Sequence, residues 1–169
     1  LQGAHQLQAY DLSPEGQASN RRVLIDYAKQ DKPCSGPDGM VADTDGTEVD
    51  YATGDFVAFL DNDDVLSPRA VEAIGQAIAL AEDIDFVYSD EDKLDQGGRR
   101  VDPFHKPAWS PERLLCQMYT CHLSAYRRAI VEQVGGLRTE FNGAQDHDLA
   151  LRISEIARRV AHIPEVLYH

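Results

Sequence analysis

The most specific chemical feature of the sequence is a group of acidic side chains directly after a short apolar run. Residues 56–60 are continuously apolar, and residues 61–64 read Asp-Asn-Asp-Asp. Such a run is typical of a strand that is buried on both faces of a parallel sheet. Ligands bind at the carboxyl ends of strands in open α/β sheets. Carboxylate oxygens at this place suit Mg²⁺ or Mn²⁺, and a bound cation would relieve the repulsion between the carboxylates.

A second chemistry fits the same residues. Aspartyl-phosphate hydrolases of the haloacid-dehalogenase kind also begin with a strand and a DxDx(T/V) motif, which residues 61–65 match. Asp61 would then be the nucleophile and Asp63 the acid/base. Ser89, after the apolar residues 86–88, would supply the hydroxyl of the second motif. Against this interpretation, the interval 66–86 leaves no room for a cap, and no basic residue is clearly placed at the head of a helix to hold a phosphate.

The charge of the chain limits its partners. Its 169 residues include 16 Lys and Arg against 29 Asp and Glu, a formal net charge of -13. A surface of that sign repels nucleic-acid phosphates, and the basic residues form no local cluster, so we expect no nucleic-acid partner. An anionic ligand would need a bridging cation. The three cysteines are odd in number and lack CxxC spacing, which favours a reducing compartment.

Strands and helices are predicted to alternate around the acidic group. Ser67 followed by Pro68 predicts a helix start, and apolar residues then recur at helical spacing as far as Ile78. Residues 85–88 are predicted as the next strand, which completes the crossover unit of α/β folds. Beyond it we expect a turn at 96–99 between two short strands, and a helix opened by Ser110 and Pro111.

The two ends of the chain differ in their predicted secondary structure. Residues 21–30 are predicted as a helix, and 31–50, rich in Gly, Pro, Asp and Thr, as a long loop. In the C-terminal half we expect two helices, 127–134 and 144–158, the first of them stopped by two glycines. The strands predicted there are 118–126, 160–163 and 166–169.

Several segments in order carry a family resemblance. They are 52–64 (ATGDFVAFLDNDD), 88–93 (YSDEDK), 106–111 (KPAWSP), 135–138 (GGLR), 145–149 (QDHDL) and 163–169 (IPEVLYH). From residue 52 to the end, the chain resembles the family 2 glycosyltransferases, inverting enzymes of the GT-A fold that use nucleotide-sugar donors. The resemblance implies an open α/β sheet, mixed but mainly parallel, flanked by helices.

Site residues follow from this resemblance. Asp61, Asn62 and Asp63 would bind the donor, and Asp63 and Asp61, completed by His169, would hold Mn²⁺ or Mg²⁺. Asp146 would be the catalytic base that takes the proton of the acceptor hydroxyl.

Other residues are expected to contact the acceptor or to support the site. Asp90, Glu91, Trp109 and Gln145 are the expected acceptor contacts. Asp148, two residues after the base, is assigned a capping or structural role.

We therefore expect a single partial glycosyltransferase domain over 1–169. Residues 1–50 would be a truncated or divergent donor-binding part without the family's first, nucleotide-binding strand, and 51–169 would hold the acidic motif, the base and the acceptor part. The partners would be a nucleotide sugar and a saccharide or lipid-linked acceptor. We expect a cytoplasmic location. If regions outside this sequence attach peripherally to the membrane, the protein would lie at its inner face. A non-catalytic, degenerate sugar-binding domain is the further alternative.

Overall fold

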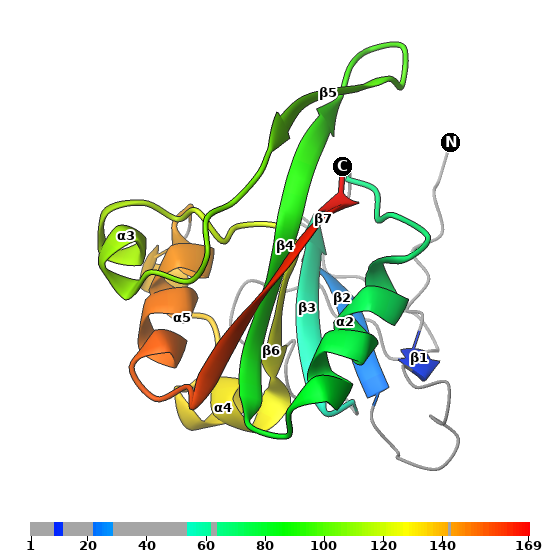
Figure 1. Ribbon diagram of the computed structural model, residues 1–169. Coiled ribbons are helices and arrows are strands. Elements are labelled where there is room, and N and C mark those ends of the chain that lie inside the picture. Colours follow the sequence, from blue (N-terminus) through cyan, green and yellow to red (C-terminus); the bar gives the residue numbers. More distant parts are fainter. Residues whose placement is uncertain (1–8, 12–21, 29–53, 62–63, 142) are drawn as a thin grey trace, which may run out of the picture.

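A mixed sheet runs through the part of the chain that the computed structural model describes, residues 9–11, 22–28, 54–61, 64–141 and 143–169. It has seven strands in the order β1-β2-β3-β6-β4-β5, and β7 also pairs with β4 (Figure 1). The strands are β1 (Ala9–Asp11), β2 (Arg22–Ala28), β3 (Phe56–Asp61), β4 (Ile84–Leu94), β5 (Arg100–Phe104), β6 (Ser124–Arg127) and β7 (Arg159–Tyr168).

The strand directions agree with the expected fold class. β2 is parallel to β3, and β7 is parallel to β4. β6 lies between β3 and β4 and is antiparallel to both, so β2, β3, β4 and β7 all run in one direction. β1 and β5 run the other way. The predicted α/β architecture with a mixed sheet is confirmed. Among the described strands, two pairs are parallel, as expected for most of the sheet, and the other four pairs are antiparallel.

Helices cover both faces of this sheet (Figure 1). On one face, α2 (Ala70–Leu80) packs its small and apolar residues on β3 and β4. On the other face lie α3 (Pro111–Cys116), α4 (Arg128–Gln133) and α5 (Gln145–Ser154). The side chains of β4 alternate between the two layers: Val87 faces α2, and Phe86 and Tyr88 face the other three helices.

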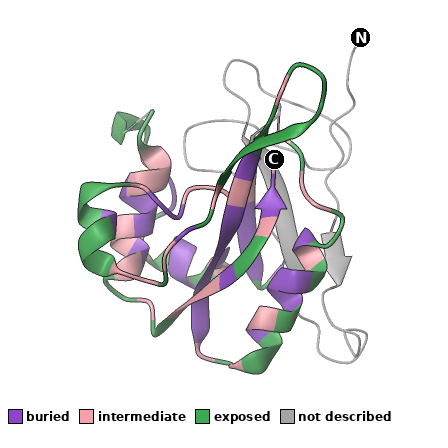
Figure 2. Ribbon diagram, turned by 45° about the horizontal axis from the view of Figure 1, so that its top comes forward, coloured by how far each residue is buried: buried purple, intermediate pink, exposed green. Residues whose placement is uncertain are grey.

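Continuous apolar runs form the buried centre, as their pattern predicts. Residues 56–58 and 60 of β3 and residues 84–90 of β4 are buried (Figure 2). Both strands have a neighbour along each edge and helices on each face, so alternation with polar residues is not required. Asp85 and Asp90 are the charged residues in this buried part of β4, and both are paired.

The helix starts differ in how well the sequence predicts them. α3 begins as expected, because the Ser110 hydroxyl accepts the Arg113 N–H at 3.2 Å and Pro111 occupies the first turn. α2 begins at Ala70, later than the Ser67-Pro68 signal, and the Ser67 carbonyl accepts the Ala70 N–H in a preceding turn. No helix in the described ranges is long and apolar enough to span a membrane.

Two predicted elements are wrong, and the two strands predicted over 160–163 and 166–169 are instead the single strand β7. Within 21–30, expected as a helix, Arg22–Ala28 is instead strand β2, which pairs residue by residue with β3. A parallel neighbour for β3 overrides the local helical pattern there. The strand predicted over 118–126 is shortened to β6, because Thr120 and His122 give their carbonyls to the Lys106 ammonium rather than to a neighbouring strand.

Candidate active site

The acidic motif lies at the carboxyl end of β3, as predicted. Asp61 is the last residue of the strand and pairs with Ala28 of β2. Its side chain, and the whole of Asn62 and Asp63, lie outside the described residues. Their donor-binding and metal-binding roles therefore stay predictions, and the geometry around them begins at Asp64.

The segment after the motif is bound to the end of β7. Val65 and His169 exchange two backbone hydrogen bonds, each 2.8 Å long, and the Ser67 N–H donates to the Leu167 carbonyl at 2.9 Å. The Tyr168 hydroxyl donates to Asp64 Oδ2 at 2.6 Å. The fold thus brings His169 beside the acidic motif, although the two are far apart in the sequence.

His169 is held by a carboxylate on the neighbouring strand. Its Nδ1 lies 2.6 Å from Asp92 Oδ1, and the Arg100 guanidinium donates to Asp92 Oδ2 at 2.6 Å. Burial acts to raise the pKa of Asp92, but its bonds to Arg100 and His169 outweigh burial and lower it. An ionised carboxylate only accepts, so Nδ1 carries the hydrogen of this bond, and Nε2 is the ring nitrogen that is left for another partner.

This arrangement fits a metal ligand. A carboxylate commonly fixes the ring of a metal-binding histidine through the nitrogen that does not bind the metal. His169 is almost fully buried, at 10% side-chain exposure. Among the described residues, no three His, Cys, Asp or Glu side chains gather as a metal site. The predicted ligands Asp61 and Asp63 are not among the side chains that the structure describes.

Helix α5 carries the predicted base in its first turn. Asp146 is half-buried. The pKa of Tyr126 is raised, mainly by burial and further by the nearby charge of Asp146. Gln145, an expected acceptor contact, instead accepts the Gly143 N–H with its side-chain oxygen at 2.6 Å. That bond tightens the turn that leads into α5.

Asp148 has the structural environment that its predicted role requires. It is buried, and its carboxylate binds the guanidinium groups of Arg138 and Arg152. The Arg138 bond is the main cause that lowers the pKa of Asp148, and Arg152 adds to it against the effect of burial. Arg152 also donates to the carbonyls of Val134 and Gly136 at 2.7 Å. The start of α5 is thereby clamped to the segment that follows α4.

Asp90, an expected acceptor contact, is buried and binds three groups of the folded chain. Its side chain is 3% exposed and accepts from three groups. They are His162 Nε2 at 2.7 Å, the Lys106 backbone N–H at 3.0 Å and His105 Nδ1 at 3.0 Å. Burial would raise the pKa of Asp90, but these bonds, His162 first, lower it. The carboxylate therefore holds β7 and the 105–106 segment against β4.

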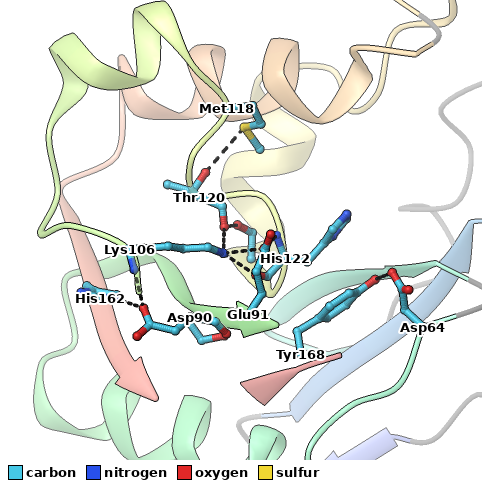
Figure 3. A network of polar contacts seen from close by, with 11 residues as sticks. Asp64, Asp90, Glu91, Lys106, Met118, Thr120, His122, His162 and Tyr168 are labelled. Carbon is cyan, nitrogen blue, oxygen red and sulfur yellow. Dashed lines mark hydrogen bonds and ion pairs between the residues drawn. The ribbon is translucent and has the colours of Figure 1, made fainter. Parts of the chain in front are cut away.

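Glu91 takes part in a second polar network (Figure 3). Its Oε2 lies 2.9 Å from the Lys106 ammonium and accepts the His122 backbone N–H at 3.1 Å. The Lys106 side chain is fully buried and also donates to the carbonyls of Thr120 and His122. Burial lowers the pKa of Lys106, and the charge of Glu91 opposes that shift.

Trp109 packs against other aromatic rings, and Ser89 is hydrogen-bonded to the backbone. The Trp109 ring lies edge-on to Phe86, with centroids 5.8 Å apart, and near Tyr119 at 6.4 Å. Trp109 is half-buried, so a part of it faces solvent. Ser89 is buried and donates its hydroxyl to the Asp90 carbonyl. A phosphohydrolase would need that hydroxyl to face a phosphate, so this contact disfavours the alternative.

Several residues of this region were not assigned a role from the sequence. Lys106 and Tyr168 lie within the family-like segments, which was the available signal for them. Asp92 also lies in such a segment, 88–93. His122 and His162 gave no signal, because their partners lie on other elements that only the folded chain brings together.

Comparison with known sequences identifies relatives. Residues 47–135 match the family model described as Glycosyl transferase family 2. The O-antigen biosynthesis protein RfbC of Myxococcus xanthus is 47% identical over 116 residues, which cover 69% of this chain and 9% of RfbC. The chain thus spans a small part of that relative's length.

Comparison with solved structures supports the fold. Residues 1–349 of S. aureus TarS superpose with a TM-score of 0.59 at 19% identity, over 73% of this chain and 37% of that one. The same TarS fragment has been solved in complex with UDP-GlcNAc. The mannosyltransferase PcManGT of Pyrobaculum calidifontis, in complex with GDP-Man and Mn²⁺, has a TM-score of 0.50 at 25% identity, over 71% of this chain and 33% of its own. The expected GT-A fold is confirmed by the likeness to TarS.

Proposed function

The chain belongs to glycosyl transferase family 2, and we propose that the protein transfers a sugar from a nucleotide-diphosphate donor to a glycan or lipid-linked acceptor with inversion. Mn²⁺ or Mg²⁺ would assist. The observation that carries the proposal is the placement of His169, oriented by Asp92, beside the acidic motif. The complexes of TarS with UDP-GlcNAc and of PcManGT with GDP-Man and Mn²⁺ support the choice of donor and metal.

The donor side of the reaction needs positive charge. The chain has a net charge of -13, so it repels a diphosphate unless a cation lies between them. Asp61, Asp63 and His169 would hold that cation, with oxygen and imidazole ligands that suit Mn²⁺. When bound, the ion offsets the charge of the diphosphate and of the nucleoside diphosphate that leaves. Asn62 would bind the donor beside them.

The acceptor side of the reaction needs a base. The acceptor hydroxyl oxygen forms the bond to the anomeric carbon, and the bond from that carbon to the diphosphate oxygen breaks on the opposite face. Asp146 would accept the hydroxyl proton as this happens. The Asp148 clamp supports this role, because it fixes the turn of α5 that carries Asp146.

The class of acceptor and the location of the protein are proposed in general terms. The name of RfbC, an O-antigen biosynthesis protein, supports polysaccharide assembly as the process. Gln145, Trp109, Asp90 and Glu91 were the expected acceptor contacts, and the part of Trp109 that faces solvent is the surface among them best suited to a sugar ring. A cytoplasmic location, with peripheral attachment to the membrane, stays a prediction.

A donor screen tests this function. The purified protein is incubated with Mn²⁺ and a panel of nucleotide sugars that includes UDP-GlcNAc and GDP-Man, and release of nucleoside diphosphate is measured. We expect release from at least one donor, and a fall of about 100-fold or more in Asp146→Asn. Glu155→Gln, an acid-to-amide change at the exposed end of the same helix, is the matched control and should retain activity.

Two other outcomes would contradict the proposal. Hydrolysis of an aryl phosphate that disappears in Asp61→Asn would indicate a phosphohydrolase. Glycan binding without nucleotide release from any donor would identify a non-catalytic sugar-binding domain.

A further inference from the structure

Tyr168 connects the end of β7 to the acidic motif. Its hydroxyl donates to Asp64 Oδ2 at 2.6 Å, and Asp64 directly follows Asp63. The tyrosine is buried, whereas Asp64 is half-exposed. A short bond from a buried tyrosine hydroxyl to a half-exposed carboxylate restricts the Asp64 side chain more than it restricts the tyrosine.

The ring and the backbone of Tyr168 are each held by a neighbour. The His122 ring stacks on it with centroids 4.6 Å apart and an angle of 14° between the planes. The backbone of Tyr168 forms a bridge with Leu66, and its neighbour His169 pairs with Val65. The Tyr168 hydroxyl is therefore held in place, and a movement of Asp64 would break the bond between them.

His122 is fixed in turn by the ion pair of Lys106 and Glu91 (Figure 3). Glu91 accepts the His122 N–H at 3.1 Å, and the Lys106 ammonium binds both the Glu91 carboxylate and the His122 carbonyl. A continuous chain of contacts thus runs from Lys106, in the interior, to Asp64, at the acidic motif. Each member lies on a different segment of the fold.

We propose that Tyr168 is a positioning residue for the metal and donor site: its hydroxyl, held by the stack on His122, binds Asp64 and so fixes the segment that directly follows the predicted ligand Asp63. This inference rests on the proposed function. Tyr168 touches neither sugar nor diphosphate, and it acts through the Asp64 carboxylate. Partners of this kind, one shell outside the metal ligands, typically affect metal affinity by 10-fold to 100-fold.

The test replaces one hydroxyl. Tyr168→Phe keeps the ring and its stack on His122 but removes the bond to Asp64. Tyr88→Phe is a closely matched control, because Tyr88 is also buried, stacks on His162 at 4.7 Å and donates its hydroxyl at 2.7 Å, but to the Pro107 carbonyl. Calorimetry measures the affinity of each variant for UDP and GDP, with and without Mn²⁺, and thermal unfolding confirms that each is folded.

Mn²⁺ should increase the nucleotide affinity of the unsubstituted protein, and we expect this increase to be about 10-fold smaller in Tyr168→Phe. The affinity measured without Mn²⁺ should stay the same. Tyr88→Phe should change neither. The inference is overturned if Tyr168→Phe keeps the full gain, if it weakens binding equally with and without Mn²⁺, or if Tyr88→Phe loses as much. If the unsubstituted protein shows no gain with Mn²⁺ for any nucleotide, the proposed function fails instead.

Discussion

Two aspartates in the first turn of α5 are predicted to have separable roles, and paired substitutions test this. Asp146→Asn removes the proposed base. Asp148→Asn removes the negative charge between Arg138 and Arg152. Both changes replace one carboxylate oxygen with an amide nitrogen and add no volume, so a difference between the variants reflects the position of the carboxylate.

The expected magnitude for Asp148→Asn comes from the contacts it loses. Asp148 is 8% exposed and Arg152 is 17% exposed, so that pair is largely shielded from water. Arg138 is 39% exposed and counts for less. Hydrogen bonds to charged groups contribute roughly 1.5 to 3 kcal/mol each, and the asparagine keeps one accepting oxygen. We expect a loss of about 2 to 3 kcal/mol, or roughly 8 °C in the melting temperature.

Acid should remove this difference. Because the pKa of Asp148 is lowered in the folded protein, its contribution to stability is complete above the ordinary carboxyl pKa and disappears as pH falls through the lowered value. The stability of Asp148→Asn should therefore approach that of the unsubstituted protein as pH falls below about 4.

Asp146→Asn should behave in the opposite way. It loses a favourable charge at the helix N-terminus, which contributes under about 1 kcal/mol, but turnover of the donor and acceptor should fall by about 100-fold or more. Urea unfolding and steady-state kinetics of both variants give the comparison. The assignment is refuted if Asp148→Asn abolishes turnover at unchanged stability, while Asp146→Asn unfolds readily and retains turnover.

Two further predictions concern buried charges. Asp85 is fully buried against Arg127 and Arg158; burial would raise its pKa, but the bonds to Arg158 and Arg127 lower it from 3.8 to about 2. Asp85→Asn should therefore cost about 2 kcal/mol at pH 7 in urea unfolding, and the difference should shrink between pH 4 and 2; an equal difference at pH 2 and pH 7 would contradict this. Lys106→Met leaves Glu91 without its cation, and we expect a loss of about 3 kcal/mol by thermal unfolding. Unchanged stability would show that this ion pair does not hold the 118–123 segment.

Local patterns were sufficient for the elements that position the site. The apolar run of β3, the glycines of the turn at 96–99 and the Ser110 cap each act within a few residues of one another. Such signals can be read from the sequence because the competing conformations are local as well. Local patterns placed the acidic motif after β3 and Asp146 in the first turn of α5. The role of Asp146 as base came from the family resemblance and stays a prediction.

Partners on distant segments account for what the sequence left open. Asp90 was expected to contact the acceptor, but His162, 72 residues further along, and the segment at Lys106 surround it. The burial of an acidic residue depends on whether the fold supplies donors for it, and no spacing rule provides that information. β2 is a similar case, since its extended conformation depends on the neighbouring edge of β3.

Pulsed electron paramagnetic resonance of the Mn²⁺ and UDP complex is the most direct measurement of the proposed metal site. If the acidic motif and His169 together hold the cation, the spectrum will show electron spin-echo modulation from an imidazole nitrogen. That modulation will disappear in His169→Gln and persist in His105→Gln, an exposed histidine that contacts Asp90. Absence of nitrogen modulation in the unsubstituted complex, or its persistence in His169→Gln, would contradict the proposed site.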